Sequence, residues 1–305
     1  MLNRLLYYFL LLPATFLPLR VMYLFTDFFY LCLITVLPYR RKVVRENIER
    51  SFPNLSVQER RKIERRFYRH LTDLLAEAAK SLSISKRHLQ QRFRVVNPEL
   101  MQALYAKNKS VLLVSGHYNN WEWLILAQDL LFPHKAVGVG TPLSSAFWDL
   151  KLTERRSRFG MHVIHANHVK VFYEKMKDQP LATLLLADQS PTDARRSYWM
   201  DFLNQPTAVL FGAEALAHQL DHAVVFFHIR KVKRGYYEME LSLITEQPRT
   251  MEWGEITEKH TRMLEKVIQE EPAYWVWSHK RWKKEVPADL EELKKMQKER
   301  FDEKR

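Results

Sequence analysis

Cysteine and glycine are scarce in this chain. Cys32 is the single cysteine among 305 residues, which excludes an intrachain disulfide and is typical of a reducing compartment. The chain has only seven glycines, and none of them forms the Gly-rich turn of a P-loop or of a dinucleotide-binding fold. The sequence therefore predicts neither a disulfide framework nor a nucleotide cradle.

Acidic residues are outnumbered: 35 Asp and Glu face 48 Lys and Arg, for a formal net charge of +13. Such a surface favours anionic partners, namely nucleic acid, anionic lipid headgroups or an acidic carrier protein. No RNP-like motif, zinc-finger spacing or obvious helix-turn-helix pattern is present, so nucleic acid is the weakest of the three.

The first 38 residues are dominated by Leu, Phe, Tyr, Val and Ile, with Arg20 and Asp27 as internal charges. Val21–Leu37 is the most apolar piece of this segment and would span about 25 Å as a helix, the short end for crossing a bilayer. It would cross once, lie in the interface, or form a kinked re-entrant pair with Leu5–Leu19; the alternative is a buried helix pair in a soluble protein. We predict that residues 1–39 anchor the chain to a membrane.

A basic cluster follows the apolar segment, at Arg40, Arg41, Lys42 and Arg45. Positive charge beside an apolar segment favours the cytoplasmic side. We expect residues 40–305 to form one catalytic domain on that side, with a highly charged tail from about residue 284.

Short apolar runs alternate with helical patterns through most of residues 93–244, which predicts an α/β fold: a mostly parallel central sheet with helices on both faces. Strands are expected within 93–104 and at Val111–Val114, Lys135–Gly140, Met161–His165, Leu181–Ala187, Ala223–Ile229 and Tyr236–Ile244. Helices are expected at Trp121–Leu131, Ala146–Phe159 and His168–Lys177, and from Pro206 to about Leu220.

The most informative stretch joins the expected strand Val111–Val114 to the expected helix Trp121–Leu131. His117 lies in the turn, Glu122 lies in the first helical turn, and Asn119 or Asn120 is the expected N-cap. A neutral imidazole can take a proton from a hydroxyl, and a carboxylate on its other nitrogen would fix the tautomer. The pattern favours base-activated acyl transfer; the alternative is a chance pairing of a loop histidine with a surface glutamate.

The segment Gly116–Glu122 resembles the His-x4-acidic motif of the lysophospholipid acyltransferase superfamily, and specifically that of bacterial lipid A late acyltransferases. The resemblance extends from about Arg40 to Lys283. It implies that His117 is the general base and that Glu122 orients it. It also implies a thioester donor, either acyl carrier protein or acyl-CoA, a hydroxyl on a lipid A precursor as acceptor, and a bacterial inner-membrane location.

Glu154–Gly160 looks like the arginine-bearing helix of that family. Arg156 matches the functional arginine, with Arg155 and Arg158 as near rivals, and its guanidinium would bind phosphate or carbonyl oxygens. The alternative is a set of surface charges, because three neighbouring arginines cannot all face one site.

Two further segments resemble family motifs, Ala187–Pro191 and Tyr274–Lys283. Asp188 follows an expected strand, where ligands approach open α/β sheets, and is expected to pair with the functional arginine; the alternative is a turn-initiating aspartate. His279 and Arg281 would bind acceptor phosphate, or would lie at the membrane surface within an aromatic belt of Trp275, Trp277 and Trp282.

His162, His165 and His168 do not share one face of a strand, and no nearby carboxylate or thiolate completes a ligand set, so we predict no metal. The resemblance likewise implies no organic cofactor. Thr141 stands where the family usually has an arginine, which keeps a lysophospholipid or aminoacyl-lipid acceptor open. A non-catalytic protein that binds anionic lipid is the alternative of a different class, favoured if His117 and Glu122 lie out of hydrogen-bond reach.

Overall fold

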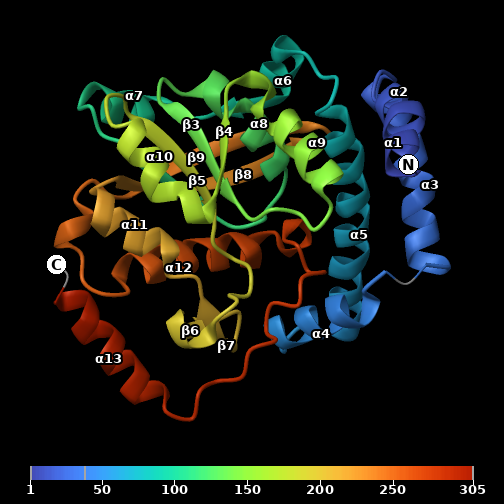
Figure 1. Cartoon of the computed structure of the whole chain (residues 1–305). Coiled ribbons are helices and arrows are strands. Elements are labelled where there is room, and N and C mark those ends of the chain that lie inside the picture. The colour runs from blue at the N-terminus through green and yellow to red at the C-terminus, as the bar shows by residue number, and fades with distance from the viewer. Residues whose placement is uncertain (1, 38, 304–305) are drawn as a thin grey trace.

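The computed structural model describes residues 2–37 and 39–303; Met1 and Pro38 of the expected anchor and Lys304 and Arg305 of the tail lie outside the described residues. A seven-stranded sheet of order β1-β9-β8-β2-β5-β3-β4 forms its centre (Figure 1). All neighbouring strands are parallel except the β8–β9 pair, which confirms the predicted mostly parallel sheet. The strands are β1 (Phe93–Val95), β2 (Val111–Ser115), β3 (Lys135–Gly140), β4 (His162–His165), β5 (Leu181–Leu186), β8 (Ala223–Lys233) and β9 (Tyr236–Thr245).

Helices cover both faces of the sheet, as the alternation predicted. The helices are α1 (Leu2–Leu5), α2 (Leu12–Ala14), α3 (Leu19–Thr35), α4 (Arg41–Ser51), α5 (Val57–Lys80), α6 (Lys86–Arg92), α7 (Glu99–Ala106), α8 (Trp121–Leu131), α9 (Ala146–Arg156), α10 (Val169–Lys175), α11 (Gly212–Leu220), α12 (Glu255–Glu270) and α13 (Leu290–Asp302). Single turns are the π turn η1 (Leu6–Leu11) and the 3-10 turns η2 (Ser157–Phe159), η3 (Ala166–His168), η4 (Ala194–Arg196), η5 (Pro248–Thr250) and η6 (Pro272–Tyr274).

The central strand β2 shows why both faces are covered. Its side chains alternate between two apolar clusters because successive residues of a strand point to opposite faces. Val111 and Leu113 pack in the cluster that includes Trp123 of α8. Leu112 and Val114 pack in the cluster that includes residues of α11 and α12. A strand buried on both faces reads as a continuous apolar run, which is what made β2 recognisable in the sequence.

The predicted helix from Pro206 to about Leu220 is wrong in its first part. Gln205–Val209 forms strand β7, which pairs antiparallel with β6 (Tyr198–Phe202), and α11 begins only at Gly212. Leu203 and Asn204 both have positive φ, as a tight two-residue hairpin turn requires. The Pro206 ring is tolerated in this strand because a two-stranded ribbon consists of edges only.

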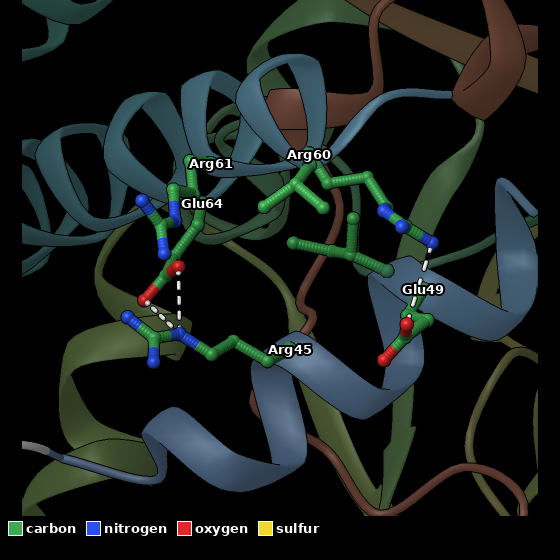
Figure 2. Close-up of a pocket in the computed structure, with 7 residues that line it drawn as sticks. Arg45, Glu49, Arg60, Arg61 and Glu64 are labelled. Carbon is green, nitrogen blue, oxygen red and sulfur yellow. Dashed lines mark hydrogen bonds and ion pairs between the residues drawn. The ribbon is translucent and has the colours of Figure 1, made fainter.

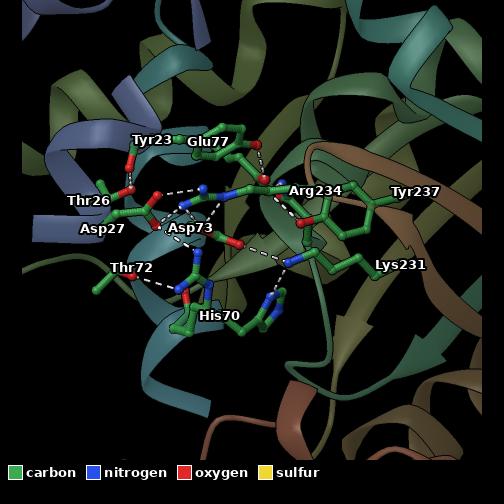
Figure 3. Close-up of polar contacts among 12 residues, drawn as sticks. Tyr23, Thr26, Asp27, His70, Thr72, Asp73, Glu77, Lys231, Arg234 and Tyr237 are labelled. Atoms are coloured by element: carbon green, nitrogen blue, oxygen red, sulfur yellow. Dashed lines mark hydrogen bonds and ion pairs between the residues drawn. The ribbon is translucent and has the colours of Figure 1, made fainter. Parts of the chain in front are cut away.

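The N-terminal helices run along α5 at one edge of the molecule, opposite α13 (Figure 1). Leu19, Met22 and Tyr23 of α3 are buried in the same apolar cluster as the sheet and α8. Polar contacts add to this packing (Figure 3). Arg234, which follows β8, donates to Asp27 of α3 at 2.5 Å and to Asp73 of α5 at 2.8 Å.

Glu77 of α5 joins α3 to the centre of the fold. Its carboxylate accepts hydrogen bonds from the hydroxyls of Tyr23 at 2.5 Å and Tyr237 at 2.7 Å, and from the side-chain amide of Asn120 at 2.5 Å (Figure 3). Burial raises the pKa of Glu77 to about 7, although the hydrogen bonds from the two tyrosine hydroxyls lower it. Within the described residues, no helix is both long enough and apolar enough to cross a bilayer.

Candidate active site

The turn between β2 and α8 carries His117 at the carboxyl end of the sheet. Asn120 is the N-cap of α8: its side-chain oxygen accepts a hydrogen bond from the backbone N–H of Trp123 at 2.9 Å. Asn119 instead adopts a left-handed backbone with φ of 52° and donates its side-chain amide to the Ile229 carbonyl at 2.7 Å. Of the two expected N-caps, the structure therefore uses Asn120, while Asn119 ties the turn to β8.

The carboxylate that contacts the His117 imidazole is Asp188, which follows β5. The two strands are parallel neighbours, so their carboxyl ends bring these residues together. Nδ1 of His117 lies 2.6 Å from Oδ1 of Asp188, and the backbone N–H of His117 donates to Oδ2 at 2.8 Å. Gly116 permits this approach, since a Cβ there would lie 2.9 Å from the Asp188 carboxyl carbon. Asp188 therefore holds His117 at both its ring and its backbone.

A third group holds the same carboxylate. The indole Nε1–H of Trp275 donates to Oδ2 of Asp188 at 2.8 Å, and the backbone of Trp275 pairs with that of Tyr118 in the motif turn. Burial by itself would raise the pKa of Asp188, but the imidazole and the three N–H contacts lower it to about 2. Asp188 is thus an ionised acceptor at neutral pH, which favours the His117 tautomer with hydrogen on Nδ1.

That tautomer leaves the Nε2 lone pair of His117 as the base. The nearest polar group is the side-chain amide of Gln189, 3.3 Å away, and the His117 side chain keeps 19% of its surface exposed. The Nε2 lone pair accepts from the Gln189 amide at a partly open position, and it can take a proton from a bound hydroxyl that displaces this amide. The site therefore has the tautomer and the access that general-base catalysis needs.

The expected contact between Glu122 and His117 is not the one that the structure forms. Glu122 pairs instead with two guanidinium groups of α9: Arg156 donates to Oε1 at 2.6 Å, and Arg155 donates to Oε2. Burial by itself would raise the pKa of Glu122, but the charges of Arg155 and Arg156 lower it. His117 lies in the turn before α8 and Glu122 lies in the first turn of that helix, so no helical spacing brings the two side chains together.

The three candidate arginines separate into two groups. Arg155 and Arg156 both face Glu122, whereas Arg158 donates to the backbone carbonyls of Ser81 and Ile84 in the connection after α5. The pKa of Arg155 is lowered by burial, although the Glu122 charge raises it. Two guanidinium groups against one carboxylate leave this cluster with a net positive charge. Arg158 instead fixes the end of α5.

The expected pairing of Asp188 with the functional arginine is also wrong, because Asp188 is occupied by His117 and Trp275. Arg281 is the cation that interacts electrostatically with the Asp188 carboxylate, and it is only 3% exposed. Burial lowers the pKa of Arg281 to about 10, and its buried Nε–H has no hydrogen-bond partner among residues 2–37 and 39–303. Arg281 therefore offsets the buried Asp188 charge from a distance.

His279 reaches the same loop as Asp188. Its Nε2 accepts a hydrogen bond from the backbone N–H of Ser190 at 3.0 Å, so the ring is neutral, and burial lowers its pKa. Trp275 and Trp277 are buried, so the alternative that they form an interfacial aromatic belt is wrong for both. Sequence reasoning thus missed the hydrogen bond of Trp275 to Asp188; the only available signal was the position of this residue in a motif that ends in His279 and Arg281.

A carboxylate-oriented imidazole with a partly open Nε2, held where a parallel strand turns into a helix, is the arrangement that hydroxyl-activating transferases and hydrolases use for general-base catalysis. The family model for bacterial lipid A biosynthesis acyltransferases matches residues 2–284. The chain belongs to this family.

Two curated relatives show the same similarity at low identity. One, from Escherichia coli, is named lipid A biosynthesis lauroyltransferase and is 24% identical over 246 residues, covering 80% of this chain and 79% of the relative. The other, from Haemophilus influenzae, is named lipid A biosynthesis acyltransferase and is 25% identical over 213 residues. That match covers 66% of this chain and spans 63% of the length of the relative.

Proposed function

We propose that the protein transfers a fatty acyl chain from a thioester donor, acyl carrier protein or acyl-CoA, to a hydroxyl of a lipid A precursor. The observation that carries the proposal is the 2.6 Å contact of Asp188 with Nδ1 of His117, which leaves Nε2 as a base. The family membership supports acyl transfer in lipid A synthesis as the reaction that this base serves.

The proposed reaction needs only a proton shuttle and charge stabilisation. Nε2 of His117 takes the proton of the acceptor hydroxyl while its oxygen attacks the thioester carbonyl, forming a C–O bond and a tetrahedral oxyanion. Asp188 stabilises the imidazolium that results. When the C–S bond breaks, the imidazolium returns the proton to the departing thiolate. The products are an ester and a free thiol, and no oxidant or metal takes part in the step.

The oxyanion and the substrate phosphates need positive charge, which the Glu122 cluster supplies. Arg155 and Arg156 exceed Glu122 by one positive charge, and Glu122 fixes both guanidinium groups. The partial positive charge at the start of α8 would add to it. We therefore assign Glu122 to positioning these arginines. Exposure favours His279 over the buried Arg281 as the contact for acceptor phosphate.

The proposed membrane association is supported by the surface of the N-terminal segment. Large apolar side chains project from α1 to α3 into solvent, including Phe9 at 78%, Phe16 at 72%, Leu24 at 68% and Phe28 at 69% exposure. Apolar surface of this extent marks an interaction site. We propose that residues 1–39 lie in the surface of the bacterial inner membrane and hold the 40–305 domain on its cytoplasmic side, within reach of a lipid acceptor.

The alternative of non-catalytic lipid binding is favoured if His117 and Glu122 lie out of hydrogen-bond reach of one another. Their expected hydrogen bond is replaced by contacts to other groups, but Asp188 supplies the carboxylate that the imidazole requires. A merely lipid-binding protein has no need of an ionised aspartate on Nδ1 of a partly open histidine. The catalytic proposal is therefore the better supported one.

The test is to incubate the purified full chain with acyl carrier protein thioesters, acyl-CoA and a lipid A precursor, and to follow products by mass spectrometry. We expect the glycolipid to gain the mass of one acyl chain. A lysophospholipid or aminoacyl lipid offered in parallel tests the identity of the acceptor. That identity is open because Thr141 stands where the family usually has an arginine. Absence of acyl transfer to all three acceptors, with each donor, would overturn the proposal.

A further inference from the structure

A hollow of about 160 Å³ lies between α4 and α5, and its lining includes no residue of the candidate active site (Figure 2). A second hollow of about 200 Å³ adjoins it and shares Arg45, Arg61 and Glu64 with it. Together they form one groove, the α4–α5 groove, lined by Ile34, Arg41, Arg45, Ile48, Glu49, Val57, Arg60, Arg61, Glu64, Arg65 and Tyr68.

The charge of this groove is unbalanced, with five arginines against two glutamates. Arg45 donates to both oxygens of Glu64, at 3.1 and 3.0 Å, and Arg60 lies 3.5 Å from Glu49 (Figure 2). These contacts use both carboxylates. The groove therefore keeps three positive charges that its own side chains do not neutralise.

Arg61 and Arg65 carry two of those charges. Both are exposed, and neither has a hydrogen-bond or ion-pair partner among residues 2–37 and 39–303. They stand four positions apart on α5, where like charges repel and destabilise a helix. An anion bound between them would remove that repulsion and gain charge-assisted hydrogen bonds.

Apolar surface begins directly beside the groove. Ile34 of α3 lines it, and Arg41 donates to the carbonyls of Leu33 and Ile34 at 2.9 and 2.7 Å, which fixes the end of α3 at the groove. Val36 and Leu37 follow with 74% and 50% exposure. An anionic group in the groove would thus have apolar surface next to it, as the phosphate of a lipid has acyl chains.

We propose that the α4–α5 groove binds the phosphate of an anionic phospholipid headgroup, at a place separate from the catalytic site. The inference rests on the membrane association of the proposed function. A hollow bordered by apolar surface suits a lipid better than the convex acidic surface of a carrier protein. Asn47 of α4 binds the Tyr274–Lys283 segment, since its side-chain amide donates to the carbonyls of Trp277 and His279 at 2.8 and 2.9 Å. A headgroup here would fix the domain at the membrane only one helix from the site.

The experiment is vesicle cosedimentation of the full chain at moderate salt, with phosphatidylcholine vesicles that contain or lack phosphatidylglycerol. We expect phosphatidylglycerol to strengthen binding, and Arg61→Gln/Arg65→Gln to lose roughly 10-fold in affinity for these vesicles only. The matched control is Lys295→Gln/Arg300→Gln on α13, which removes the same charge from the opposite edge and should keep wild-type binding. Thermal unfolding checks that each variant is folded.

Three outcomes would overturn the inference. In the first, the groove variant binds phosphatidylglycerol vesicles as wild type does, or loses no more affinity than the α13 control. In the second, it keeps vesicle binding and loses saturation by acyl carrier protein, which would assign the groove to an acidic protein. If wild type bound no vesicles but still acylated a lipid A precursor in detergent, both this inference and the membrane proposal would fail while the proposed chemistry would stand.

Discussion

Asp188 and Glu122 are two shielded carboxylates beside the same turn, with side-chain exposures of 4% and 16%. Asp188 is paired with an imidazole, whose charge can change near neutral pH. Glu122 is paired with two guanidinium groups, whose charge is fixed. The first arrangement can follow the movement of a proton, whereas the second provides a constant field. The two carboxylates are similarly buried but suit different chemical roles. The partner of each carboxylate, and not the carboxylate itself, determines that role.

Replacing His117, the proposed base, abolishes the His117–Asp188 pair completely. We expect His117→Ala to lower turnover by about 10³-fold, the range that general-base catalysis contributes, with a nearly unchanged thermal midpoint because the ring is partly exposed. Steady-state acyl transfer measures the effect. A variant that retained a tenth of wild-type turnover would show that His117 is not the base.

The second largest effect is expected for Asp188→Asn. The oxygen of the new amide would go to Oδ2, where the backbone N–H of His117 and the Trp275 indole both donate, so its NH₂ would face Nδ1. That forces hydrogen onto Nε2 and disables the base, which we expect to cost about 10²-fold in turnover at unchanged donor KM. Normal turnover, or a loss confined to KM, would contradict the assigned role.

Glu122→Gln tests the other carboxylate. Both guanidinium groups would lose their counter-charge, so we expect the free energy of unfolding to fall by about 3 kcal/mol and kcat/KM to fall by roughly 30-fold through misplaced arginines. The pH dependence of the residual activity should keep the wild-type midpoint, since the His117 contact is intact. If that midpoint moved, Glu122 would act on the imidazole after all.

The smallest effect is expected for Trp275→Phe, which removes one of the donors that hold the pKa of Asp188 near 2. In wild type, the stability from ionised Asp188 is complete above its ordinary value of 3.8 and is lost as pH falls through about 2. The variant, with a higher folded pKa, has less of this stability to lose and loses it at higher pH. Urea unfolding between pH 5 and 2 measures the shift; we expect turnover within 10-fold of wild type.

The sheet and the position of the catalytic turn followed from local pattern. β2 and β5 are apolar runs with sharp ends, so His117 and Asp188 could each be placed after a strand. Their contact could not be foreseen, because it depends on which two strands are neighbours. The sequence motif instead suggested Glu122, which is near in sequence but belongs to the helix. The hairpin at Pro206 was missed because a proline before an apolar stretch also marks a helix start.

The packing of the N-terminal segment against the domain could not be predicted from local pattern either, because it also depends on residues that are distant in sequence. Asp27 meets Arg234 more than 200 positions away, and Tyr23 meets Glu77 on α5. Contacts between residues so far apart in sequence leave no periodic pattern. The many Phe and Leu residues on the exposed face of the segment also mask the pattern of the few residues that face the domain. The apolar character of the segment was clear from composition, but the position at which it packs against the domain was not.

The contact between Glu77 and the N-terminal segment has a practical consequence. A shortened protein that starts near residue 40, made to improve solubility, would lose the Tyr23 hydroxyl from Glu77, while Asn120 and Tyr237 remain. Asn120 caps the helix that follows His117. Removing this segment would therefore disturb the neighbour of the helix cap as well as the proposed membrane contact, and low activity in such a version would say little about the intact protein.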